Sequence, residues 1–97
     1  MKIRLDAQAK SDLKQIREYL LQHASESGAN KVREHLRTRI ARLVKTPSIG
    51  VATSDPQVRI LSPAKHPYRI YFSVEGDTIV ILHIRHTARR APEDEFR

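Results

Sequence analysis

The sequence has no cysteine and no tryptophan, and three tyrosines and two phenylalanines are its only large aromatic residues. Without cysteine, disulfides and thiolate metal sites are excluded. With so few aromatic residues, the core is predicted to consist of Ile, Leu and Val. No segment approaches the ~20 consecutive apolar residues of a membrane helix, and residues 1–6 lack the apolar run of a signal peptide. We therefore expect a cytoplasmic protein.

Acidic residues are also few: eleven Asp and Glu stand against eighteen Lys and Arg, which gives a net charge of +7. Such a charge favours polyanions, acidic proteins or acidic membrane surfaces as partners. With 97 residues the chain supports one domain with one two-layer core. We expect residues 1–97 to form that domain, with a charged, proline-broken and flexible tail at about residues 87–97.

The N-terminal half predicts a short strand followed by two helices. Residues 2–5 alternate polar and apolar side chains, and Asp6 suits the N-cap of a helix. An apolar stripe at helical spacing then ends near His23, and it consists of Ala9, Leu13, Ile16, Leu20 and Ala24. After a polar break at residues 25–28, a second stripe stops before Pro47, and it consists of Val32, Leu36, Ile40 and Leu43. The two segments predict a helical hairpin.

The C-terminal half predicts three strands. Residues 47–57 have two prolines and no periodicity, which predicts the longest loop. Residues 58–61, 68–74 and 78–86 are rich in β-branched and aromatic side chains, and Gly76 lies in a tight turn between the last two. The predicted fold is α+β, with an N-terminal strand, a two-helix hairpin and a three-stranded antiparallel meander. The helices cover one face of the sheet and leave the other exposed.

Strand alternation sorts side chains between these two faces. The predicted helix-facing set is Val58, Ile60, Tyr68, Ile70, Phe72, Val74, Val80, Leu82 and Ile84. The predicted exposed set is Arg59, Arg69, Tyr71, Ser73, Ile79, Ile81, His83 and Arg85. Three arginines on one face predict a site for phosphate or carboxylate. The alternative is a solvated face whose arginines deter aggregation; the two exposed isoleucines favour a binding surface.

Other candidate sites are weaker. The second helix is strongly basic and either contacts a macromolecule or is solvated, and its cationic residues are Lys31, Arg33, Arg37, Arg39, Arg42 and Lys45. His83 and His86 are three apart, so a strand places them on opposite faces and a metal pair is not expected. No glycine-rich phosphate loop is present in the sequence. We expect neither a metal nor a cofactor.

Several motifs together resemble the ParE/RelE superfamily of bacterial toxins from type II toxin-antitoxin systems. They cover nearly the whole chain: Ala9-x-x-Asp12-Leu13-x-x-Ile16-x-x-Tyr19-Leu20, Leu43-x-x-x-Pro47-x-x-Gly50, Val58-Arg59-Ile60-Leu61, Tyr68-Arg69-Ile70-x-Phe72-x-Val74 and Ile79-x-Ile81-Leu82-x-Ile84-x-His86. The segment from Leu43 to Gly50 and the ending His86-x-x-Arg89 are more similar to the ParE branch than to the RelE branch.

The resemblance implies a growth-inhibiting toxin that contributes to plasmid stabilization. A ParD-like antitoxin would neutralise it by wrapping an extended segment over its surface in a hetero-oligomeric complex. ParE-like members poison DNA gyrase and have no established catalytic residues, so this chain is expected not to be an enzyme. The residues expected to contact the target or the antitoxin are Arg37, Arg39, Arg42, Arg59, Arg69, Tyr71, Ile79, Ile81, His83 and Arg85.

Two alternatives remain. RelE-like members cleave mRNA on the ribosome, and in that case Arg69 and Arg85 would hold the phosphate while His86 served as acid or base. Residues 87–92 lack the tyrosine that RelE-like nucleases often carry there, which favours ParE. The net charge and the basic helix would also suit a small nucleic-acid-binding regulator, whose DNA affinity would depend steeply on salt.

Overall fold

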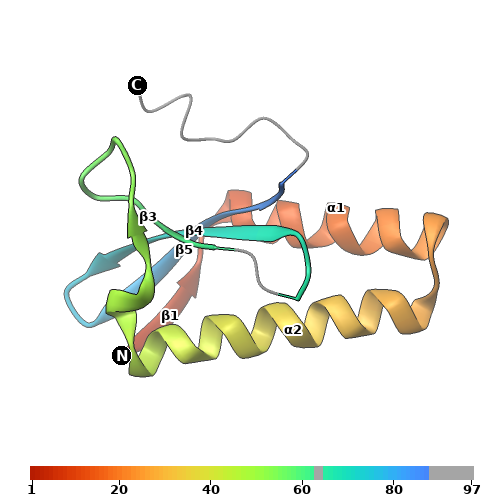
Figure 1. Ribbon diagram of the computed structural model, residues 1–97, viewed down its shortest axis with the longest axis horizontal. Coiled ribbons are helices and arrows are strands. Elements are labelled where there is room, and N and C mark those ends of the chain that lie inside the picture. Colours follow the sequence, from red (N-terminus) through yellow and green to blue (C-terminus); the bar gives the residue numbers. More distant parts are fainter. Residues whose placement is uncertain (63–64, 88–97) are drawn as a thin grey trace.

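A computed structural model describes residues 1–62 and 65–87 of the chain (Figure 1). Its elements in chain order are β1 (Lys2–Leu5), α1 (Ala7–His23), α2 (Glu26–Lys45), the 3₁₀ turn η1 (Pro47–Ile49), β2 (Val51–Ala52), β3 (Arg59–Leu61), β4 (Tyr68–Glu75) and β5 (Thr78–His86). The predicted first strand, helical hairpin and C-terminal strands are thereby confirmed. The predicted tail lies, apart from its first residue, outside the described residues. None of the described helices has the length and apolar character needed to cross a bilayer.

Local signals in the sequence explain where the helices begin and end. Asp6 precedes α1 in an extended conformation, although its side chain makes no capping hydrogen bond to the described residues. Ser25 caps α2, because its hydroxyl oxygen accepts the Gly28 N–H at 2.9 Å. The last turn of α2 carries Arg42 and Lys45, whose positive charges interact favourably with the negative end of the helix dipole.

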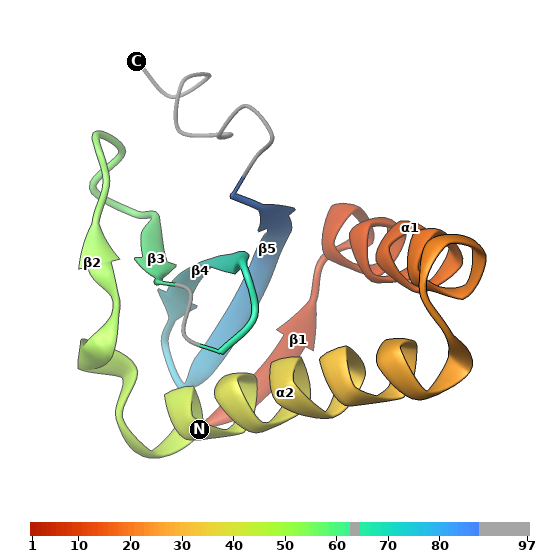
Figure 2. The same ribbon diagram turned by 45° about the vertical axis from the view of Figure 1, so that its right-hand side comes forward.

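The five strands form one mixed sheet in the order β1-β5-β4-β3-β2. The predicted meander of β3, β4 and β5 is antiparallel, whereas β1 runs parallel to β5, with Lys2 opposite Thr78. Figure 2 shows this order, with α1 beside β1 and β5 and with α2 running below the sheet. At the turn between β4 and β5, Gly76 adopts the predicted positive φ, 61°.

The prediction of an unstructured loop at residues 47–57 is wrong in its first half. This segment contains η1 and β2, and β2 extends the sheet by pairing with β3. Gly50 permits this path, because a Cβ at this position would lie 2.4 Å from Cζ of Phe72. The backbone therefore passes directly over the Phe72 ring, which no sequence periodicity indicates.

The predicted inward side of β4 is largely confirmed. Tyr68, Ile70 and Phe72 are buried in the main hydrophobic cluster, together with residues of both helices. Val74, which was predicted to face inward as well, is 43% exposed near the end of the strand.

The predicted alternation of β5 is wrong before residue 83, because a β-bulge interrupts the strand. Tyr71 pairs with His83 while Phe72 pairs with Ile81, so Leu82 is an extra residue on β5. An extra residue reverses the alternation, and Ile79 and Ile81 therefore lie in the main cluster with no exposed surface. Val80 is also buried but lies outside that cluster. After the bulge, Ile84 faces the helices as predicted.

The side chains of β3 also face the opposite sides of the sheet from those predicted. Arg59 pairs with Phe72, and Leu61 pairs with Ile70, so both β3 residues lie on the helix side of the sheet. Ile60 pairs with Tyr71 and lies on the other side. The sequence offered no guide, because a three-residue strand carries too little alternation to fix its orientation.

Candidate functional site

Four side chains gather on the face of the sheet that points away from the helices. Arg69 lies directly opposite Arg85, and Tyr71 lies directly opposite His83, so all four share this face. We call them the sheet-face cluster. The Tyr71 side chain is completely buried, and those of His83 and Arg85 are 19% and 26% exposed. The face predicted to be exposed is therefore closed at its centre, and its arginines are half-buried.

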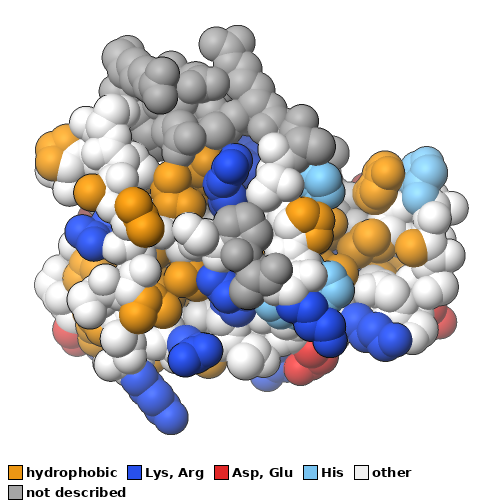
Figure 3. All heavy atoms as spheres, in the orientation of Figure 1, with side chains coloured by type: hydrophobic (Ala, Val, Ile, Leu, Met, Phe, Trp, Pro, Cys, Tyr) orange, Lys and Arg blue, Asp and Glu red, His pale blue; other side chains and the backbone are white. Residues whose placement is uncertain are grey.

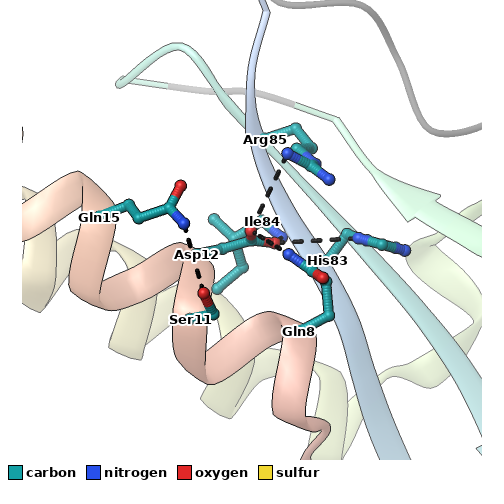
Figure 4. A network of polar contacts seen from close by, with 7 residues as sticks. All are labelled: Gln8, Ser11, Asp12, Gln15, His83, Ile84 and Arg85. Carbon is teal, nitrogen blue, oxygen red and sulfur yellow. Dashed lines mark hydrogen bonds and ion pairs between the residues drawn. The ribbon is translucent and has the colours of Figure 1, made fainter.

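A buried carboxylate joins helix α1 to this cluster (Figure 4). Asp12 is 3% exposed, and its Oδ2 atom accepts the backbone N–H of Ile84 at 3.0 Å. Its Oδ1 atom accepts a hydrogen bond from Gln8 at 2.9 Å. His83 Nδ1 and Arg85 Nη1 lie 3.9 and 4.0 Å from its oxygens. Asp12 thus holds the backbone of β5 and neutralises part of the cluster's charge.

The end of β1 explains why a helical side chain reaches this strand. The pairing of β1 with β5 ends at Leu5 and Ile81, and the Asp6 N–H donates the last bond to the Ile81 carbonyl. Beyond that point α1 lies beside β5, so Asp12 accepts a hydrogen bond that a neighbouring strand would otherwise accept. The sequence did contain a signal for Asp12, because it is an acidic residue directly beside the apolar stripe, one turn after Ala9.

Arg85 retains capacity for a further anion. The Asp12 carboxylate already accepts two hydrogen bonds and lies 4.0 Å from the Arg85 guanidinium. The Nε atom of Arg85 is buried and has no hydrogen-bond partner among the described residues. Guanidinium groups of this kind bind carboxylate or phosphate in a bidentate manner. Because the Arg85 side chain is 26% exposed and Arg69 lies directly opposite, the exposed parts of the two guanidinium groups can meet one acidic group.

Arg59 does not belong to this cluster. It lies on the helix side of the sheet, and its Nη2 atom donates a hydrogen bond to the carbonyl of Gly50. The predicted patch of three arginines is therefore a pair, because β3 has the opposite orientation to the one that alternation indicated.

His86 is also separate from the two arginines. It pairs with Tyr68, whose side chain is in the main core, and the two rings meet edge to face at 5.4 Å. A groove of about 240 Å³ between α1 and the end of β5 is lined by Asp12, Gln15, Ile16, Tyr19, Tyr68, Ile84 and His86. His83 and His86 therefore face opposite sides of the sheet, as predicted. Across residues 1–62 and 65–87, no three His, Asp or Glu side chains are arranged to hold a metal ion.

The three basic residues singled out on α2 do not form one surface. Arg37 is exposed and lies 3.8 Å from Glu34. Arg39 instead donates from Nη2 to the carbonyl of Ser62 and ties α2 to the segment after β3. Arg42 is exposed near the end of the helix. Only Arg37 and Arg42 are thus available to a large partner.

Residues 3–91 match the family described as the ParE toxin of the type II toxin-antitoxin system parDE. The chain belongs to the ParE toxin family. A comparison with curated proteins finds no match.

Two solved structures have the fold of this ParE-family chain. The chromosomal ParDE toxin-antitoxin system from P. aeruginosa matches with a TM-score of 0.77 and 24% identity, over 89% of this chain and 95% of that one. The isolated E. coli RelE toxin matches with a TM-score of 0.64 and 13% identity, over 98% of this chain and 93% of that one. The predicted kinship with the ParE/RelE superfamily, and with its ParE branch, is confirmed.

Proposed function

We propose that this ParE-family toxin acts in the cytoplasm by poisoning DNA gyrase, and that a ParD-like antitoxin neutralises it. The observation that carries the proposal is the family match over residues 3–91, which includes every strand and helix except the first residue of β1. The likeness to a ParDE system from P. aeruginosa supports an antitoxin as partner. The net charge of +7 suits an acidic partner.

The sheet-face cluster is the proposed contact surface for an acidic group of the target or the antitoxin. Arg69 and Arg85 supply the charge, and Asp12 fixes the backbone from which Arg85 extends. Arg37 and Arg42 are proposed as additional contacts, since both are exposed. Ile79 and Ile81 are excluded as contacts of the folded toxin because they have no exposed surface.

The position of His86 supports a protein inhibitor over a nuclease. A proton donor or acceptor must come within about 3 Å of the group it serves. His86 lies on the helix side of β5, whereas Arg69 and Arg85 lie on the other side. A phosphate held by the two arginines would therefore be separated from His86 by the sheet.

The gyrase proposal is tested with purified toxin, gyrase and relaxed plasmid DNA. We expect supercoiling to fall and cleaved DNA to accumulate as the toxin concentration rises. Supercoiling that continues at a large molar excess of folded toxin would contradict the proposal. Addition of a ParD-like antitoxin should restore supercoiling.

Substitutions then test the contact surface. Arg69→Ala should raise the toxin concentration needed for half inhibition by about 10- to 100-fold, because a hydrogen bond to a charged group contributes about 1.5–3 kcal/mol. Arg17→Ala is the matched control, because Arg17 is an exposed arginine on α1, away from the sheet face. Equal effects of the two variants would remove the sheet-face cluster from the contact surface without touching the family assignment.

Ribosome-dependent mRNA cleavage is the second candidate, because Arg69 and Arg85 lie directly opposite each other and can share a phosphate. In that reaction His83, not His86, is on the same side of the sheet as the arginines. The test incubates toxin with programmed ribosomes and maps mRNA ends. Cuts at fixed codon positions that are lost in Arg69→Ala would favour the nuclease; intact mRNA would eliminate it.

A further inference from the structure

A second group of basic side chains lies where α2 meets the segment before β4. His35 of α2 and His66 meet edge to face, with ring centroids 4.7 Å apart. Arg39 is one helical turn beyond His35, and Lys65 precedes His66 in the chain. We call these four residues the imidazole cluster. In Figure 3, blue and pale-blue side chains gather over the middle of α2.

The electrostatic environment of this cluster is positive. Burial lowers the pKa of His35, and His66, Arg39 and Lys65 lower it further. The charged groups of α2 near His35 include Lys31, Arg39 and Glu34, but Glu34 lies 3.8 Å from Arg37. The charged groups from the segment before β4 are Lys65 and His66. Glu26, at the start of α2, is the remaining acidic residue of the lining.

An open depression of about 770 Å³ gives access to these groups. Its lining consists of the two histidines, the carboxylates of Glu26 and Glu34, and five residues that can donate hydrogen bonds, namely Ser27, Asn30, Lys31, Thr38 and Lys65. Next to it, the Nε atom of Arg39 is buried and lacks a hydrogen-bond partner among the described residues. Two imidazoles and the ammonium groups of Lys31 and Lys65 therefore share one accessible site, and Arg39 adds positive charge from beside it.

We propose that the imidazole cluster binds a phosphate group. A dianion offsets the positive charge of Arg39 and Lys65 around His35, and it allows His35 to take up a proton and donate a hydrogen bond. A divalent metal ion is disfavoured, because Arg39 and Lys65 repel it. The site shares no residue with the sheet-face cluster, so it is a function in addition to the proposed inhibition of gyrase. The phosphate belongs either to a nucleic-acid backbone or to a free anion.

The direct test follows the imidazole C–H signals of the histidines by NMR while inorganic phosphate replaces chloride at constant ionic strength. We expect the signals of His35 and His66 to shift in a saturable manner and the pKa of His35 to rise as phosphate binds. His66→Gln should weaken binding by at least about tenfold, equivalent to about 1.4 kcal/mol. His23→Gln is the control, because His23 is exposed and stacks on Tyr19, away from the depression.

A second arm distinguishes the sources of the phosphate. If a short DNA duplex shifts the same two signals at a lower concentration of phosphate groups than the free anion does, the ligand is a nucleic-acid backbone. If the free anion alone shifts them, the ligand is a small phosphate. Absence of a shift with both ligands, or equal shifts of His23 and His35, overturns the proposal. Saturation by Zn²⁺ but not by phosphate also overturns it.

A pH measurement checks the cluster without a ligand. Because the pKa of His35 is lower in the folded chain than its ordinary value, the unfolded chain binds the proton more readily. Stability should therefore fall as pH is lowered through about 6.5, the ordinary histidine pKa. In His35→Gln, the urea midpoint should drop less between pH 7.5 and 5.5 than in the parent or in His23→Gln. An unchanged drop would contradict the proposed environment of His35.

Discussion

The two ends of β5 are held by different means. Its first half, up to Ile81, lies between β4 and the parallel strand β1 and forms backbone hydrogen bonds on both sides. Its second half lies between β4 and helix α1, where the Asp12 carboxylate accepts the Ile84 N–H. Both halves pair with β4, but on the other side the first half has a strand as its neighbour, whereas the second half has one carboxylate, which also lies near His83 and Arg85.

This difference explains why the partly exposed polar side chains of β5 lie in its second half. Regular pairing with β1 accompanies complete burial of Ile79 and Ile81. The bulge at Leu82 marks the change, and the half-buried His83 and Arg85 follow it. Bulges commonly redirect side chains near functional sites, and here the bulge separates the structural half of β5 from the half that carries the sheet-face cluster.

The largest expected effect comes from changing the packing of the first half. Ile81→Ala should lower the free energy of unfolding by about 2–5 kcal/mol, because it removes a fully buried side chain from the core. Leu82→Ala is the matched variant and should cost clearly less, because Leu82 is the half-buried extra residue of the bulge. Urea denaturation measures both. Equal costs, or a larger cost for Leu82→Ala, would mean that the alternation is not reversed.

A smaller effect is expected from removing the carboxylate of the second half. Asp12→Ala should cost about 1–3 kcal/mol, because it leaves the buried Ile84 N–H without an acceptor. Asp12→Asn keeps an acceptor oxygen and should cost less. Hydrogen exchange of the Ile84 amide provides the local readout: it should accelerate in Asp12→Ala and not in the control Glu18→Ala, an exposed position of α1. Unchanged exchange in Asp12→Ala would show that the bond does not protect this strand.

The smallest effect on stability is expected from removing an exposed ion pair between β1 and the end of β4. Arg4 Nη2 lies 3.2 Å from Glu75, and both side chains are more than half exposed. Arg4→Ala should change the free energy of unfolding by no more than about 1 kcal/mol, because exposed ion pairs contribute little. Denaturation at low and high salt measures it, with Lys10→Ala as an exposed control. A loss as large as that of Asp12→Ala would contradict the view that the backbone holds this half.

The helices, and the positions of the longer strands along the chain, were predictable because their signals are local. The stripe from Ala9 to Leu20 and the Gly76 turn each lie within one element, and the structure has both as predicted. The β2 strand was not predictable, because its path depends on Gly50 packing over Phe72, a contact between distant segments. The parallel pairing of β1 with β5 is likewise a long-range choice.

The candidate site was predicted in part. Arg69, Tyr71, His83 and Arg85 share the expected face because each lies on the side of the bulge where the assumed alternation holds. Ile79 and Ile81 were misplaced because one extra residue inverts everything before it in β5. Asp12 was not predicted as a site residue: its place beside the apolar stripe is unusual for a carboxylate, but a sequence does not reveal which helical carboxylate meets a strand end.

The pairing of β1 with β5 also has a consequence for biosynthesis. In the parallel pairing, Lys2 lies opposite Thr78, and Leu5 lies opposite Ile81. Contacts so distant in sequence are among the last that a folding chain can close. A nascent polypeptide that lacks β5 has neither the strand that joins β1 to β4 nor Arg85, so β1 cannot enter the sheet until β5 has been synthesised.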